Sequence, residues 1–99
     1  MSAVSIRADG ERRYCVDGDL VFGTVAELLS WPASLVGDNG TVVVDLQGVD
    51  HADSAGLALI LEWTDLAASE GKDLRFANLP ESLVRIGALT NLDSLVPVV

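Results

Sequence analysis

The chain has 99 residues, with fifteen Asp or Glu against six Lys or Arg and a formal net charge of −9 at pH 7. This length suits one domain, which we place at residues 1–99. Because 49% of the residues are apolar, the chain can bury an ordinary core, and disorder is not expected. The negative charge repels phosphate backbones and anionic headgroups, which disfavours nucleic acid or a lipid surface as a direct partner.

The cysteine content and the apolar runs indicate in which cellular compartment the protein is expected. The one cysteine, Cys15, cannot form an internal disulfide and has no Cys or His at metal-ligand spacing, which favours a reducing, cytoplasmic setting. The longest apolar run, residues 57–61, is far short of the roughly 20 residues that a membrane span needs. No N-terminal stretch has the basic start and long apolar run of a secretory leader. We therefore expect no direct membrane insertion.

The first part of the chain predicts two strands. Residues 5–7 indicate a weak edge strand, and the alternation of Tyr14 and Val16 with their neighbours predicts a half-buried strand. Gly18 and Asp19 then have turn chemistry.

The next segment predicts a helix and a central strand. Thr24 is a candidate N-cap, and apolar residues recur at helical spacing until Trp31 and Pro32, where proline should break or bend the helix. Residues 37–40 predict a turn. Residues 41–46 are rich in β-branched residues and show almost no alternation, which indicates a central strand, and residues 47–51 form a predicted polar loop.

The longest predicted element is a helix over residues 54–70, closed by Gly71 as its left-handed C′ residue. It carries two apolar stripes, the second made by Leu59, Trp63 and Leu66, so it should pack against more than one element. Trp is also enriched at interface hot spots, but we expect this stripe to pack in the core, against the helix that begins at Pro80.

The rest of the chain completes an α/β pattern. Residues 74–77 predict a strand, and a helix follows with Pro80 at its first position and an apolar face of Leu83, Val84 and Ile86. Residues 92–99 could add a short turn and a last strand. The order β-β-α-β-α-β-α predicts a single small α/β domain, with helices packed on a mixed sheet of four to five strands.

The candidate site is the junction between the central strand and the main helix, because function concentrates in loops at the carboxyl ends of strands. Asp53 and Ser54 stand at the start of that helix, where free N–H groups favour a negative charge. The simpler interpretation is that one of them only caps the helix.

An enzyme or metal centre has little support here. Asp50, His51, Asp53 and Ser54 are close in sequence, but the chain lacks a G-x-S-x-G elbow, a glycine-rich phosphate loop and a second histidine. We expect no catalysis, no cofactor and no metal, and we interpret His51 as a loop residue.

Residues 45–71 resemble the STAS family, and the resemblance extends over nearly the whole chain. The diagnostic feature is a strand followed by a short run that opens a helix: Asp53, Ser54, Ala55, Gly56 and Leu57. The family includes bacterial anti-sigma-factor antagonists, tails of sulfate transporters and the MlaB subunits of phospholipid-transport ABC systems. In the antagonists the serine after that aspartate is phosphorylated, which corresponds to Ser54.

Within this family the chain is most similar to MlaB. The similarity lies in residues 56–61, residues 65–67 with Gly71, and residues 88–92. Residues 22–36 match MlaB poorly, and the placement of Trp31 and Pro32 has no clear counterpart there. MlaB has a threonine at the Ser54 position, where it meets its ABC ATPase partner. The resemblance thus implies a cytoplasmic, non-catalytic subunit, peripheral to the inner membrane, that binds an MlaF-like ATPase subunit and through it the permease, and supports assembly or activity.

Two alternatives remain open. The chain could be an anti-sigma-factor antagonist whose partner is an anti-sigma factor kinase, with Ser54 phosphorylation expelling the partner through added negative charge. It could also carry lipid, which predicts a sizeable apolar cavity. In either protein-binding case, the acidic residues Asp45, Asp50 and Asp53 are expected to steer a basic partner toward Ser54.

Overall fold

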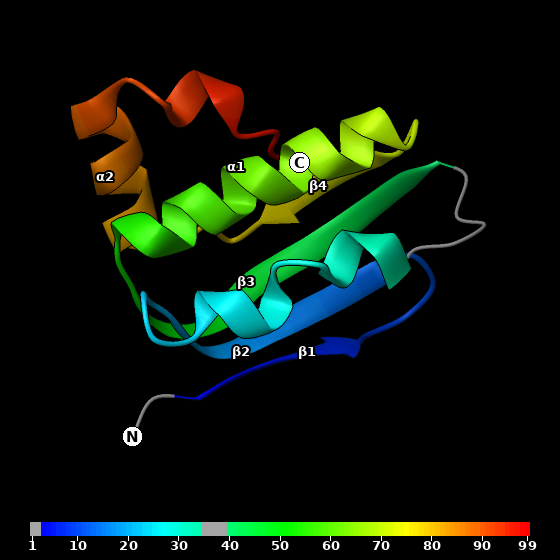
Figure 1. The fold of residues 1–99 in the computed structure, drawn as a ribbon, viewed down its shortest axis with the longest axis horizontal. Helices are drawn as coiled ribbons and strands as arrows, with labels where there is room; N and C mark the ends of the chain where they lie inside the picture. Colours follow the sequence, from blue (N-terminus) through cyan, green and yellow to red (C-terminus); the bar gives the residue numbers. More distant parts are fainter. Residues whose placement is uncertain (1–2, 35–39) are drawn as a thin grey trace.

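A computed structural model describes residues 3–34 and 40–99, which form a four-stranded sheet with helices packed on it (Figure 1). The described elements, in chain order, are strands β1 (Val4–Ala8) and β2 (Arg13–Leu20), 3-10 helices η1 (Val25–Leu28) and η2 (Trp31–Ser34), strand β3 (Thr41–Ala52), helix α1 (Ser54–Ser69), strand β4 (Asp73–Ala77), helix α2 (Glu81–Thr90) and 3-10 helix η3 (Asp93–Leu95). The predicted α/β class is confirmed.

The sheet is mixed, as expected, with the strand order β1-β2-β3-β4. Strand β1 pairs antiparallel with β2 at one edge, while β2, β3 and β4 are mutually parallel. At the β4 edge, Val98 forms a single parallel bridge with Phe76, which is what remains of the predicted last strand. Because β2 and β3 are parallel neighbours, their carboxyl ends meet at the edge of the sheet where α1 begins.

One face of the sheet forms the core. Val42, Val44 and Leu46 alternate along β3 and are almost completely buried, which is the period of two expected for one strand face. Trp63 of α1 and Phe76 of β4 are the largest side chains with no exposed surface. Leu57 and Ile60 of α1 belong to the same apolar cluster.

Trp63 is a core residue, but the expected packing of its stripe against α2 is wrong. Its indole Nε1 donates to the carbonyl oxygen of Leu28 at 2.8 Å, and its ring lies 4.9 Å from Trp31 and 6.4 Å from Phe76, centroid to centroid. The second stripe of α1 therefore packs under the η1 and η2 segment. This arrangement also excludes Trp63 as an exposed interface residue.

Two predicted breaks are wrong, because both strands continue through them. Gly18 and Asp19 lie inside β2, and residues 47–51 lie inside β3, where Gly18 pairs with Val49 and Asp19 with His51. Register shifts accompany this extension. Gly18 has a φ of +101°, and a Cβ there would collide with the Ala3 carbonyl, so the glycine bends the strand instead of ending it.

The helix predicted from Thr24 is two short 3-10 segments. The Thr24 hydroxyl makes no cap; it is buried and donates to the Asp19 carbonyl at 2.6 Å while accepting from the Val21 N–H at 3.1 Å. Pro32 has no N–H to continue the hydrogen bonding of a helix, so the helical structure is interrupted between η1 and η2. The turn predicted at residues 37–40 lies, apart from Gly40, outside the described residues.

The two α-helices begin and end almost as predicted. Asp53 caps α1, and Gly71, with a φ of +72°, follows its C-cap. Pro80 is the N-cap of α2 rather than its first residue. Val84 is 51% exposed, because the buried face of α2 is formed by Leu83 and Gly87 and does not include Val84.

None of the described helices is long and apolar enough to cross a membrane.

Candidate functional site

Asp53 holds the start of α1. One carboxylate oxygen, Oδ1, accepts from the backbone N–H groups of Ala55 at 2.9 Å and Gly56 at 3.4 Å. This is the side-chain cap expected of aspartate at an N-cap position. The capping interpretation therefore holds for Asp53, and Ser54 stands beside it as the exposed first residue of the helix.

The same aspartate also ties α1 to the segment after β2. Its second oxygen, Oδ2, accepts from the backbone N–H of Phe22 at 3.3 Å, and its own N–H donates to the Leu20 carbonyl at 3.2 Å. Both contacts reach more than thirty residues back along the chain. Asp53 thus holds the backbone of Phe22 next to the start of α1.

The predicted site residues divide into two groups by exposure. Gly56 and Leu57 are buried, and a Cβ on Gly56 would lie 2.5 Å from the Leu20 carbonyl oxygen, so this turn of α1 packs directly on the end of β2. Ser54 is exposed, and Asp53 and Ala55 are partly exposed. A partner can therefore reach the last three, while the first two hold the helix in place.

Asp50 and His51 do not complete a catalytic group. Both lie in the last part of β3 and are exposed, and His51 is opposite Asp19 in the sheet. Within residues 3–34 and 40–99, no group of three or more His, Cys, Asp or Glu side chains is arranged to hold a metal ion.

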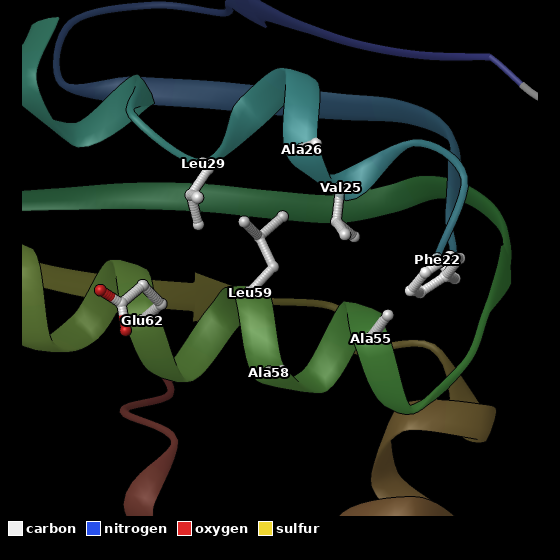
Figure 2. A pocket seen from close by; sticks show the side chains of 8 residues that line it. All are labelled: Phe22, Val25, Ala26, Leu29, Ala55, Ala58, Leu59 and Glu62. Carbon is white, nitrogen blue, oxygen red and sulfur yellow. The ribbon is translucent and has the colours of Figure 1, made fainter.

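An apolar groove begins next to Ser54 and runs between η1 and α1 (Figure 2). Its volume is about 610 Å³, and it is open at the surface. Eight residues line the groove, four on each wall. The wall formed by η1 and its flanking residues contributes Phe22, Val25, Ala26 and Leu29, and the α1 wall contributes Ala55, Ala58, Leu59 and Glu62. Figure 2 shows Val25 and Leu29 pointing toward Leu59, with Phe22 facing Ala55 at one end and Glu62 at the other.

Large apolar side chains of the groove are exposed to solvent, as in a binding surface, instead of being buried as in a core. Phe22 is 85% exposed and Leu29 is 49% exposed, although both are large apolar side chains. Leu59, at the base, is only 2% exposed. Contiguous exposed apolar surface of this kind marks interaction sites. The lipid-carrier alternative predicts a sizeable apolar cavity, and the apolar space found here is a groove that is open at the surface.

The segments that contribute the two walls of the groove are acidic, and Glu62 is the acidic residue among the eight that line it. Residues 21–34 and 53–70 contain five acidic residues and no Lys or Arg: Glu27, Asp53, Glu62, Asp65 and Glu70. The six basic residues of the chain all lie in other segments. The negative charge of the protein is thus not offset at this surface, which favours a basic partner.

Asp45 is not part of that acidic surface. It lies on the opposite face of the sheet, where its side chain accepts from Arg13 at 2.8 Å, from Asn78 at 3.0 Å and from the Gln47 N–H at 2.9 Å. Burial opposes the charge of this carboxylate, but the three hydrogen bonds prevail and lower its pKa. The expectation that Asp45 steers a partner toward Ser54 is therefore wrong, because Arg13 already pairs with it.

Sequence reasoning missed the groove because its two walls come from distant segments of the chain, residues 22–29 and 55–62. The one signal was Phe22, an aromatic residue next to Gly23 between a strand and a candidate cap, where a core side chain is not expected. The position of η1 over α1 depends on tertiary contacts that no local pattern encodes.

The comparisons with known proteins agree with this fold. The family described as "Mlab, STAS domain" matches residues 6–97, so the chain belongs to the STAS family, in its MlaB-type branch. STAS domains are generally non-catalytic binding or regulatory domains, and the match indicates no enzymatic family. The chain is also similar to a solved structure described as "Crystal Structure Analysis of Mglu", with 25% identity and a TM-score of 0.57. That similarity covers 78% of this chain but only 19% of the other, so this chain spans about a fifth of the length of that protein.

Proposed function

We propose that this STAS domain binds the ATPase subunit of a phospholipid-transport ABC complex and supports its assembly or activity. The supporting observation is the exposed Ser54 end of α1, which continues into an open apolar groove. The membership in the MlaB-type family supports this choice of partner. In this proposal the domain is cytoplasmic and reaches the inner membrane only through the ATPase subunit and the permease.

The site suits binding better than catalysis. Asp53 uses both carboxylate oxygens on backbone N–H groups, so it is not a free base for a Ser54 nucleophile. Phe22, Leu29 and the alanines of α1 offer contact area instead. An aromatic side chain at the edge of an apolar groove is typical of a protein interface.

Co-expression with the ATPase subunit encoded in the same genome tests the proposal. The two proteins should co-purify, and Ser54→Glu should reduce the recovered complex at least about tenfold, since a buried charge at an interface is costly. Ser69→Glu adds the same charge at the exposed far end of α1 and should leave the complex intact. Failure of the wild-type proteins to form a complex would contradict the proposal.

One observation favours the second candidate, a phospho-regulated anti-sigma-factor antagonist. Ser54 is exposed and lies at a helix N-terminus, where the positive end of the helix dipole favours a negative charge. A phosphate would add a charge of about −1.5 to −2 beside Asp53 and could expel a partner. Incubation with the serine kinases of the genome and ATP, followed by intact-mass measurement, separates the two: stoichiometric phosphate on Ser54 supports the antagonist.

A further inference from the structure

The groove between η1 and α1 has the length of a short helical contact. Its α1 wall runs from Ala55 to Glu62, which is eight residues, or about 10 Å of helix. A partner helix laid along it would present about two turns, that is, apolar side chains at positions i, i+3 or i+4, and i+7.

The walls of the groove leave room for large side chains. Ala26 on η1 and Ala55 and Ala58 on α1 are small, and Ala26 and Ala58 are exposed. The buried side chain of Leu59 forms the base of the groove between the two walls. Large apolar residues such as Leu could therefore fit between these alanines as knobs into holes.

Charge decides what kind of helix fits. The segments that form the two walls carry five acidic residues and no basic one, and Glu62 itself lines the groove. A second copy of this chain would bring an equally acidic surface against this one, and an anionic lipid headgroup would be repelled in the same way. A helix with Lys or Arg beside its apolar stripe would be attracted.

We propose that the groove binds an amphipathic helix with basic flanks, carried by the ATPase partner, whose apolar side chains fill the space between Val25, Leu29 and Leu59. This inference rests on the proposed function for the identity of the partner. The chemistry of the bound element follows from the groove alone: two turns of helix, large apolar residues on one side, and Lys or Arg next to Glu62.

A peptide-binding measurement on the full chain tests the chemistry. Two fluorescein-labelled amphipathic helices of about 15 residues serve as probes, one built from Leu and Lys and the other from Leu and Glu. Fluorescence anisotropy should show that the wild-type protein binds the Leu/Lys peptide and not the Leu/Glu peptide. Binding of the Leu/Glu peptide with equal or greater affinity would overturn the inference.

Matched variants separate groove binding from general attraction between opposite charges. Ala58→Arg, or Ala26→Arg on the other wall, should weaken binding of the Leu/Lys peptide about tenfold or more, because it fills the groove with a positive charge. Ala68→Arg adds the same charge at an exposed position of α1 outside the groove and should change the affinity less than about threefold. Equal weakening by all three variants would overturn the inference, and circular dichroism confirms that each is folded.

The same variants distinguish this inference from the proposed function. If the ATPase subunit binds the wild-type protein and Ser54→Glu weakens the complex, but Ala58→Arg and Ala26→Arg do not, the proposed function stands and the groove is not the contact. If no complex with the ATPase subunit forms, the proposed function fails, and the peptide measurement still decides whether the groove takes a basic helix.

Discussion

The carboxylate of Asp53 accepts a hydrogen bond from the backbone N–H of Phe22, at 3.3 Å, while it caps α1 through its other oxygen. A residue at the start of α1 thereby holds the most exposed aromatic side chain of the described structure beside Ser54. The cap and the binding surface depend on the same side chain.

Replacing Asp53 should therefore affect both stability and binding. Asp53→Ala removes the cap and should lower the free energy of unfolding by about 0.5–2 kcal/mol, measured by urea denaturation. It should also weaken the complex with the ATPase subunit, because Phe22 loses its anchor. Phe22→Ala is the matched control, since it should weaken binding with little change in stability. A destabilised Asp53→Ala that binds as well as the wild type would show that the anchor does not matter for docking.

Gly56 should not tolerate even the best helix former. Ala is favoured over Gly in a helix by up to about 1 kcal/mol, yet a Cβ here would meet the Leu20 carbonyl oxygen at 2.5 Å. We expect Gly56→Ala to lower the thermal midpoint, because either α1 or the end of β2 must shift. Ala58→Gly, on the exposed side of the same helix, should lower it only through helix propensity. A rise in the midpoint for Gly56→Ala would contradict the close packing.

Trp63 should matter through its indole N–H as well as its size. Trp63→Phe keeps an aromatic ring but leaves the buried carbonyl of Leu28 without its donor, which costs about 1–3 kcal/mol. In a domain of this size, each kcal/mol corresponds to roughly 4–8 °C in the thermal midpoint, which differential scanning calorimetry resolves. An unchanged midpoint would mean that the hydrogen bond contributes nothing. Leu66→Ala, at the partly exposed end of the same stripe, should be much milder.

Asp45 should make stability depend on acid pH. Its pKa in the folded chain lies below the ordinary value of 3.8, so its ionised form stabilises the fold above that pH. This contribution is lost as the pH falls from about 4 through the lower folded pKa. Asp45→Asn should reduce the free energy of unfolding at pH 7 and flatten its decline below pH 4. Asp73→Asn is a control on an exposed ion pair, and an equal effect there would contradict the special role of Asp45.

Local patterns in the sequence were sufficient to predict the strands and helices that form the core. The apolar run of β3 and the two stripes of α1 indicated a central strand and a helix buried on two sides, and the structure shows both. The family resemblance rested on the run from Asp53 to Leu57, and the match over residues 6–97 confirms it.

The errors occurred where tertiary contacts decide the local structure. Gly18 and Asp19 have turn chemistry, but pairing with Val49 and His51 keeps them in a strand. Thr24 has the chemistry of a cap, but its hydroxyl is used on the Asp19 carbonyl. The groove requires η1 to lie over α1, which depends on contacts such as that between Trp63 and Leu28 across 35 positions.

Amide hydrogen exchange of the chain with and without the ATPase subunit tests the central claim most directly. If the Ser54 end of α1 and the groove form the contact, the complex should slow exchange in residues 21–29 and 54–62. Exchange on β1, an edge strand that contributes no residue to the groove, should be unchanged. Slower exchange confined to β1 and β2, or no change with a bound partner, would contradict the account.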